Sequence, residues 1–202
     1  ISAQDESEAL YRKGLVEYRQ ERYSAAREDF MRLIAANADS SKIQAAHVML
    51  AKTLYRLGKF PAADSVGQKL RAGFPDGPYV EWTYYLESAC ALRSGNAGRA
   101  LELLAWLTAN SRDMKLKSRC LRALRFTVIP LAGADQSKAR LNEYGIGSAD
   151  LDATEPYDLS DIFDIEDELS SAALSSRPGK EVSRTKPDIA RIGLLTSLSG
   201  PN

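Results

Sequence analysis

The sequence contains few of the residues on which metal sites and enzymes depend. Its 202 residues include one histidine, His47, and two cysteines, Cys90 and Cys120. A single histidine excludes a metal site built from several histidines, and no glycine-rich loop of the kind that cradles phosphates is present. We therefore expect no catalytic residue, no cofactor and no metal, and we expect His47 to be packed on a helix.

Long apolar runs are also absent. Hydrophobic residues make up 44% of the chain, which is enough for a buried core. No stretch approaches the roughly 18 uninterrupted apolar residues that indicate a membrane-spanning helix, so we expect no membrane span. The two cysteines lie in helical patterns, where buried free thiols are expected. A disulfide between Cys90 and Cys120 is the alternative if the protein resides in an oxidising compartment.

An excess of charge of either sign is missing, because 27 basic residues balance 27 acidic ones. The two signs are nevertheless separated along the chain. Residues 1–149 hold 22 Lys and Arg against 16 Asp and Glu, whereas residues 150–168 hold nine acids and no base. The basic residues are dispersed and no aromatic or glycine-rich binding motif accompanies them, so the pattern does not indicate nucleic acid. It indicates a mildly basic body followed by an acidic segment.

An internal repeat of 37 residues is the main feature of the sequence. Three stretches that begin at Ala9, Ala46 and Thr83 align without gaps. Two antiparallel helices approach closely only where side chains are small, so we expect Gly14 to face Ala26 across a hairpin. Three sets of positions recur in register: Gly14, Ala51 and Ser88; Ala26, Ala63 and Ala100; and Leu33, Leu70 and Leu107.

The turn within each repeat has its own signature. Glu21, Gly58 and Gly95 stand where a left-handed residue is often needed, and an aromatic residue follows two positions later in the first two repeats. This pattern resembles the tetratricopeptide repeat over residues 8–112. The resemblance implies an all-α fold, a right-handed α-solenoid of three helical hairpins. A generic helical bundle is the alternative, and three ungapped copies argue against it.

The third repeat departs from the family pattern. Ala97 replaces the aromatic residue, Glu87 stands at a position where leucine is usual, and Arg112 replaces a proline. Residues 113–145 read as a degenerate fourth hairpin that caps the stack, with a first helix ended by Pro130 and Gly133 and a shorter partner that stops at Gly145. We therefore place the repeat domain at residues 1–145.

The rest of the chain has a different composition. Residues 146–187 are rich in Asp, Ser, Glu and Pro and read as a flexible linker. Residues 188–202, "DIARIGLLTSLSGPN", read as a buried β-strand followed by a loop of small residues. This stretch resembles the first strand and loop of type I periplasmic substrate-binding proteins, the branched-chain amino-acid receptor group. The resemblance implies that Ser197 and Ser199 bind ligand in a complete receptor domain, of which this chain holds only the beginning.

The order of repeats, linker and receptor-like strand resembles the lipoprotein activators of penicillin-binding proteins. That resemblance implies export from the cytoplasm, into the periplasm or to a membrane anchor.

In the repeat family the first helix of each hairpin lines a concave groove that binds a protein or peptide. The matching residues here, which include Tyr-Arg pairs at the period of the repeat, are Tyr11, Arg12, Tyr18, Arg19, Lys52, Tyr55, Arg56, Trp82, Tyr85 and Arg93. Packing between repeats is the alternative role for the tyrosines.

One segment of the linker has the pattern of an amphipathic helix. Within residues 158–174, Leu159, Ile162 and Phe163 fall on one side at helical spacing, and acids surround them. We expect this segment to dock on the repeats, either in the same chain or in a second copy, which leaves a homodimer open. A disordered acidic tether is the alternative.

The leading functional hypothesis is a non-enzymatic protein-interaction scaffold of an exported bacterial protein whose C-terminal part is a substrate-binding domain. Two alternatives stay open. The first is a receptor for amino acids or similar small molecules in which the repeats act as a spacer. The second is a cytoplasmic repeat adaptor in which the C-terminal strand is incidental.

Overall fold

The computed structural model describes residues 3–36 and 40–154. The predicted docking segment, the rest of the linker and the C-terminal strand with Ser197 and Ser199 lie outside these residues. The chain divides into two compact units, and the boundary falls after Cys90. Every regular element in the described part of the chain is a helix, as the sequence predicts. None of the helices found there has the length and apolar character to cross a membrane.

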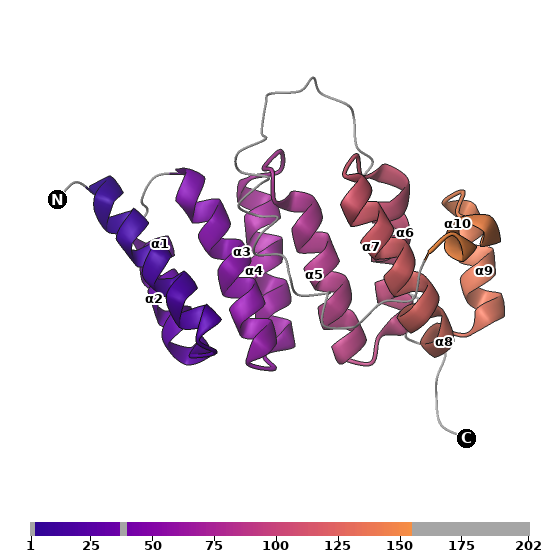
Figure 1. Ribbon diagram of the computed structural model, residues 1–202, viewed down its shortest axis with the longest axis horizontal. Coiled ribbons are helices and arrows are strands. Elements are labelled where there is room, and N and C mark those ends of the chain that lie inside the picture. Colours follow the sequence, from indigo (N-terminus) through magenta and orange to yellow (C-terminus); the bar gives the residue numbers. More distant parts are fainter. Residues whose placement is uncertain (1–2, 37–39, 155–202) are drawn as a thin grey trace. The chain divides into compact units, whose positions relative to one another are not determined.

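The helices repeat with the period of the sequence. The first helices of the three hairpins are α1 (Ala3–Arg19), α3 (Ser40–Arg56) and α5 (Val80–Arg93), and the second helices are α2 (Tyr23–Ala35), α4 (Phe60–Gly73) and α6 (Ala97–Asn110). Arg19, Arg56 and Arg93 each end a first helix, at intervals of 37 residues. In the first unit the hairpins α1–α2 and α3–α4 lie side by side, with α2 packed against α3 (Figure 1). The predicted hairpin repeats are thus confirmed.

Each hairpin turn contains one residue in the left-handed region. The φ angles of Glu21, Gly58 and Gly95 are 58°, 71° and 78°. At the first turn the amide of Arg22 donates to the carbonyl of Glu17 at 2.9 Å, which closes the helix end. The equivalent bonds in the other repeats measure 2.9 and 2.8 Å. The left-handed turn is therefore a repeated structural element, as the sequence predicts.

Aromatic side chains brace the first two turns. The ring of Tyr18 meets that of Tyr23 edge-on at 5.3 Å between centroids, and Tyr55 meets Phe60 in the same way at 5.2 Å. Edge-to-face pairs of this kind add stabilisation beyond the area that they bury. The last turn of each first helix is thus held against the start of the second.

The close approach within the first hairpin differs in detail from the prediction. A Cβ atom at Gly14 would lie 2.6 Å from a ring carbon of Phe30. The absence of a side chain at position 14 therefore makes room for the Phe30 ring. Ala26 is also fully buried, but Gly14 accommodates the ring one turn further along α2. The small side chain at position 14 therefore allows an aromatic residue to fill the space between the helices.

A buried ion pair explains why the third repeat carries an acid where leucine is usual. The Nη2 atom of Arg71 on α4 lies 2.6 Å from Oε2 of Glu87 on α5, with 10% and 3% of the two side chains exposed. The same guanidinium lies 4.1 Å from the ring centroid of Tyr84 and donates to the hydroxyl of Thr83 at 3.3 Å. Arg71 thus binds α5 through three side chains.

The second unit begins its capping hairpin with α7 (Met114–Ala123), which continues as a π-helical segment η1 (Leu124–Val128) and α8 (Ile129–Ala132). Pro130 does not end this helix, contrary to the prediction. A proline lacks an amide donor and crowds the preceding turn, and the wider turn of η1 just before it accommodates the ring. The helix ends at Gly133, which has a φ of 93°.

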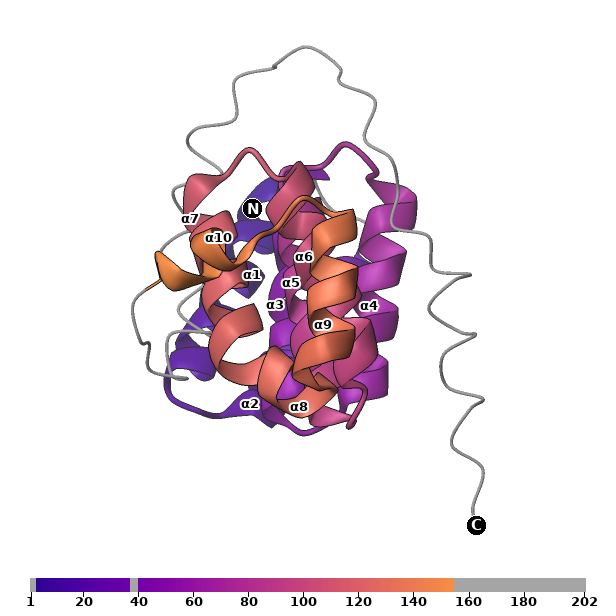
Figure 2. The same ribbon diagram turned by 90° about the vertical axis from the view of Figure 1, so that its right-hand side faces the viewer.

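The helical structure extends past residue 145, where the linker was expected to begin. After α9 (Ala134–Glu143) and a left-handed Gly145 comes α10 (Ser148–Asp152). Figure 2 shows α10 beside α7, and α9 beside α6. Arg125 of η1 fastens this end, because its Nη1 atom donates to the carbonyls of Leu151 at 2.7 Å and Thr154 at 3.1 Å. The first residues of the expected linker therefore belong to the folded unit.

We predict that Gly14→Ala destabilises the protein. The new methyl group would overlap the buried Phe30 ring, and overpacking of this kind costs about 1–3 kcal/mol. Urea denaturation followed by circular dichroism measures the change in the free energy of unfolding. Gly73→Ala is the control, because nothing lies within 4 Å of a Cβ atom there. Equal stability of the two variants would contradict the prediction.

We also predict that Glu87→Leu destabilises the protein by about 3–5 kcal/mol, because it leaves the Arg71 guanidinium buried without its carboxylate. We expect this loss although leucine is the residue usual at this position in the repeat family. The double variant Arg71→Met, Glu87→Leu should recover much of that loss, because it removes both charges. A double-mutant cycle in urea measures both. A double variant no more stable than Glu87→Leu alone would argue against the ion pair as the cause.

Candidate functional site

The structure distributes the predicted groove residues between the surface and the interior. On the first helices the arginines Arg12, Arg19, Arg56 and Arg93 are exposed, and Tyr11 and Tyr55 are half-buried. The buried members of the predicted set are Tyr18, Lys52, Trp82 and Tyr85. Their burial supports a packing role, which for Tyr18 and Tyr85 is the alternative that the sequence left open. Partner binding by the exposed members stays a prediction.

Tyr18 shows how the buried members are used. Its ring lies 5.2 Å from the ammonium of Lys52, a cation–π contact between α1 and α3. Its hydroxyl accepts a hydrogen bond of 3.3 Å from Nε of Arg56, the arginine that ends the next first helix. The Tyr18 side chain thereby connects one repeat to the next. The recurrence of Tyr-Arg pairs in the sequence is thus explained in part by packing contacts between neighbouring repeats.

A basic and partly apolar face remains on α1. Arg12, Val16 and Arg19 follow one another at helical spacing, and 48% of Val16 is exposed. Arg12 forms an ion pair of 2.7 Å with Glu8, while 76% of its own side chain stays accessible. Lys42 binds the second oxygen of Glu8 at 2.7 Å, and the hydrogen bonds from Lys42 and Arg12 lower the pKa of that carboxyl. We call Arg12, Val16 and Arg19 the α1 face.

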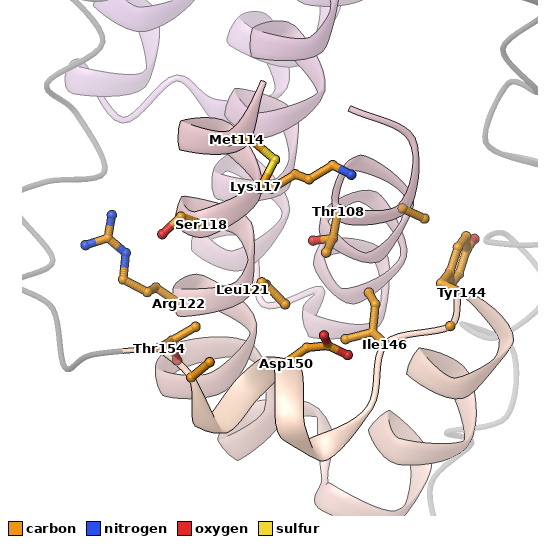
Figure 3. Close-up of a pocket in the computed structure, with 13 residues that line it drawn as sticks. Thr108, Met114, Lys117, Ser118, Leu121, Arg122, Tyr144, Ile146, Asp150 and Thr154 are labelled. Carbon is orange, nitrogen blue, oxygen red and sulfur yellow. The ribbon is translucent and has the colours of Figure 1, made fainter. Parts of the chain in front are cut away.

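The second unit contains a hollow of about 770 Å³ beside α7 (Figure 3). Met114 and Leu121 supply apolar surface, and Lys117 and Arg122 supply positive charge. The carboxylate of Asp150 also borders the hollow, and it caps α10 by accepting the amide of Gly147 at 2.8 Å. The remaining lining residues, from the end of α6 to the end of α10, are Thr108, Ala109, Ser118, Tyr144, Gly145, Ile146, Ala153 and Thr154.

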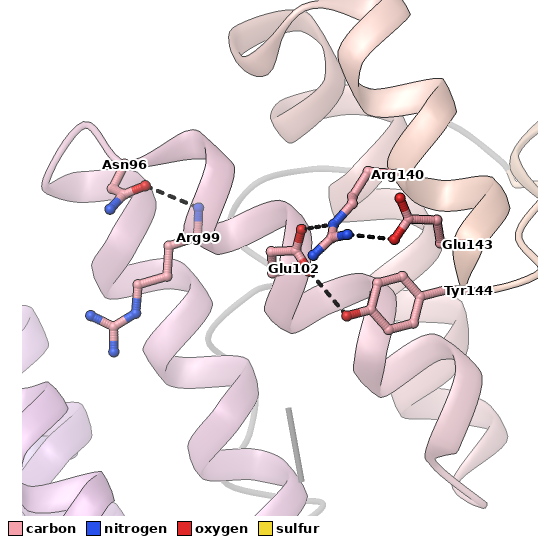
Figure 4. Close-up of polar contacts among 6 residues, drawn as sticks. All are labelled: Asn96, Arg99, Glu102, Arg140, Glu143 and Tyr144. Atoms are coloured by element: carbon pink, nitrogen blue, oxygen red, sulfur yellow. Dashed lines mark hydrogen bonds and ion pairs between the residues drawn. The ribbon is translucent and has the colours of Figure 1, made fainter. Parts of the chain in front are cut away.

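A buried carboxylate stands next to this hollow. Glu102 of α6, 4% exposed, forms an ion pair with Arg140 of α9 and accepts a hydrogen bond of 3.0 Å from the hydroxyl of Tyr144 (Figure 4). Arg140 also pairs with Glu143 on its own helix. Burial and the charge of Glu102 raise the pKa of Tyr144 to about 12. The cluster holds α9 and the turn after it against α6.

Sequence reasoning did not identify this cluster, although a signal for it was present. Glu102 is the only charged residue within "ALELLAWL", an otherwise apolar helical stretch. A lone acid in such a setting indicates a buried partner of opposite charge. The partner lies 38 residues further along the chain, so only the tertiary structure identifies it.

The one histidine of the sequence, His47, lies on α3. Nδ1 of His47 lies 2.8 Å from the carbonyl oxygen of Ile43, one turn earlier on the same helix, and the ring is half-buried. No group of three or more His, Cys, Asp or Glu side chains suited to a metal ion occurs among residues 3–36 and 40–154.

Comparison with known proteins identifies a family. The model of the YfiO family, described as outer membrane lipoprotein, matches residues 3–124, which is more than half of the chain and covers α1 to α7. No curated protein and no solved structure matches the chain significantly. The receptor-like stretch at residues 188–202 lies outside the matched region.

The raised pKa of Tyr144 predicts a particular dependence of stability on pH. The folded chain holds the tyrosine proton up to about pH 12, whereas an unfolded chain releases it near the ordinary value of about 10. The resulting stabilisation is complete below about pH 10 and is lost as the pH rises through the folded pKa. Tyr144→Phe should therefore be less stable than the unaltered protein at pH 8, by about 1 kcal/mol for the lost hydrogen bond. That deficit should shrink between pH 10 and pH 12.

Urea denaturation at a series of pH values measures this difference. Glu102→Gln serves as the control, because removal of the negative charge should let Tyr144 ionise at a lower pH. A deficit for Tyr144→Phe that stays constant up to pH 12 would show that burial and Glu102 do not govern this tyrosine.

Proposed function

The chain belongs to the YfiO family of outer membrane lipoproteins, and from this premise we propose that it is a non-enzymatic scaffold that binds a protein or peptide partner. The family supports an exported protein that is anchored to a membrane, and the repeated hairpins supply the rigid surface that an interaction module needs. Localisation at a membrane is part of the proposal.

The exposed arginines at the repeat period are the observation that carries this function. Arg19 and Arg56 end successive first helices, 37 residues apart, and both are exposed. A cation at the end of a helix is favoured by the helix dipole, but that preference does not require arginine. Arginine forms bidentate hydrogen bonds with carboxylates and is over-represented at interaction hot spots.

The α1 face indicates the chemistry of the partner. Val16 offers an apolar contact between the two exposed guanidinium groups of Arg12 and Arg19. A helix or strand that carries carboxylates on either side of an apolar side chain complements this arrangement. We therefore propose an acidic amphipathic segment of another envelope protein as the partner.

The end of the sequence supports a finer proposal. The stretch "IGLLTSLSGPN" resembles the opening of a type I periplasmic substrate-binding domain, and we propose that such a domain follows the repeats, with Ser197 and Ser199 near its ligand. An activator of penicillin-binding proteins would have this architecture. The solute-receptor alternative places the function in that domain, whereas the scaffold proposal places it on the repeats. The matching family is described as outer membrane lipoprotein, and such proteins are exported. This description argues against the hypothesis of a cytoplasmic adaptor.

Site-specific photo-cross-linking tests the scaffold proposal. A p-benzoylphenylalanine at Val16, between the two arginines, should form an adduct with one defined envelope protein in the native host. The same group at Met31, which is 52% exposed on α2, should not form that adduct. The charge contribution is tested by Arg19→Glu, which should reduce the Val16 adduct several-fold.

Arg32→Glu is the matched control for this charge reversal. Both arginines are exposed in the last turn of their helices, so both substitutions disturb the helix dipole alike. An adduct that forms equally from positions 16 and 31, or that falls equally in both charge variants, would contradict a binding site on the α1 face.

A further inference from the structure

The hollow beside α7 lies where the described chain ends. Thr154, the last described residue, lines it together with Ala153. Arg125 holds this end in place through the carbonyls of Leu151 and Thr154, and its Nη2 atom lies 3.4 Å from a carboxylate oxygen of Asp152. The following residues therefore start their path at the edge of the hollow.

The surface of the hollow combines apolar and basic groups. Met114 is 73% exposed, which is the largest fraction among the exposed large hydrophobic residues described. One turn further along α7, Lys117 also lines the hollow, and within the described residues its ammonium makes no ion pair. Leu121 continues the same surface, and Arg122, which also lines the hollow, extends its guanidinium toward the other side of α7 (Figure 3). A segment with apolar anchors and carboxylates is the complement of this surface.

The charge distribution along the chain supplies that complement. Residues 112–125, which contain α7, hold six basic residues and one acid. Residues 155–168, which follow directly from the edge of the hollow, hold seven acids and no base. The contacts of Arg125 with the end of α10 fix the chain directly before this acidic stretch. A tethered segment also binds at a high effective concentration, so a weak contact suffices.

The reach of the chain is sufficient. Leu121 and Met114 are seven residues apart on α7, which is about 10 Å at roughly 1.5 Å per residue. The five residues from Thr154 to Leu159 span up to about 17 Å when extended. This reach exceeds the length of α7 between Leu121 and Met114.

We propose that residues 158–174 of the same chain dock in the hollow beside α7, with Phe163 and Ile162 against Met114 and Leu121, and with their acids facing Lys117 and Arg122. The hollow is then occupied by the chain itself. The proposal concerns the second unit, whereas the α1 face lies in the first. Each can therefore fail without the other.

Peroxide oxidation of the three methionines tests the proposal in the full chain. Exposed thioethers are oxidised to sulfoxides, which mass spectrometry quantifies for each residue. Met114 is the probe, Met31 on α2 is an exposed reference at 52%, and Met49 on α3, 1% exposed, reports unfolding. If the segment docks, Met114 should be oxidised several-fold more slowly than Met31, although the described structure leaves it more exposed.

Substitutions in the segment and in the hollow test whether docking of the segment is what protects Met114 from oxidation. Phe163→Ala should raise the oxidation rate of Met114 to at least that of Met31, while Met49 stays protected. Phe163→Leu, which keeps an apolar anchor, should retain most of the protection. Lys117→Glu should also raise the rate, whereas Lys138→Glu on α9, exposed and outside the hollow, should not.

Two results would overturn the proposal. Oxidation of Met114 as fast as that of Met31 in the unaltered chain would show that the hollow is open. Protection of Met114 that disappears on dilution would assign the occupant to a second copy of the chain.

Discussion

The left-handed residue at the end of each first helix is the constraint on which the repeat depends. A helix ends where its last carbonyls find donors outside the regular ladder, and a residue with positive φ turns the chain so that the next two amides reach back to them. In this protein the turn recurs at Glu21, Gly58 and Gly95 with φ between 58° and 78°. Because the turn has the same geometry each time, it reverses the chain in the same way in all three repeats. Gly145 ends α9 in the same conformation.

Buried ion pairs supplement apolar packing where the repeat pattern degenerates. One pair joins Arg71 to Glu87, where the repeat family would place an apolar residue. The other joins Arg140 to Glu102, where the regular repeats have ended. Each pair connects two packed helices. Such pairs contribute little net stability, since desolvation offsets much of the attraction. An unpaired charge at the same depth is far more costly, so the pairs favour one helix arrangement over others. We regard this selectivity as their main effect.

The two candidate surfaces differ in what they offer a partner. The α1 face is open and carries guanidinium groups around one apolar side chain. The hollow beside α7 is concave and basic, and it lies where the acidic segment of the same chain begins. Both surfaces suit acidic amphipathic segments, because each combines basic side chains with apolar ones.

The sequence by itself determined the period of 37 residues, the three hairpins and the left-handed turns, because these depend on local features: small residues in register, turn residues and helical periodicity. The tertiary structure decided what each side chain does within that frame. It placed Tyr18 and Lys52 in the interior, matched Gly14 with Phe30 rather than Ala26, and let the last long helix continue through Pro130. It also joined Glu102 to Arg140, because partners far apart in the chain meet only when the helices have packed.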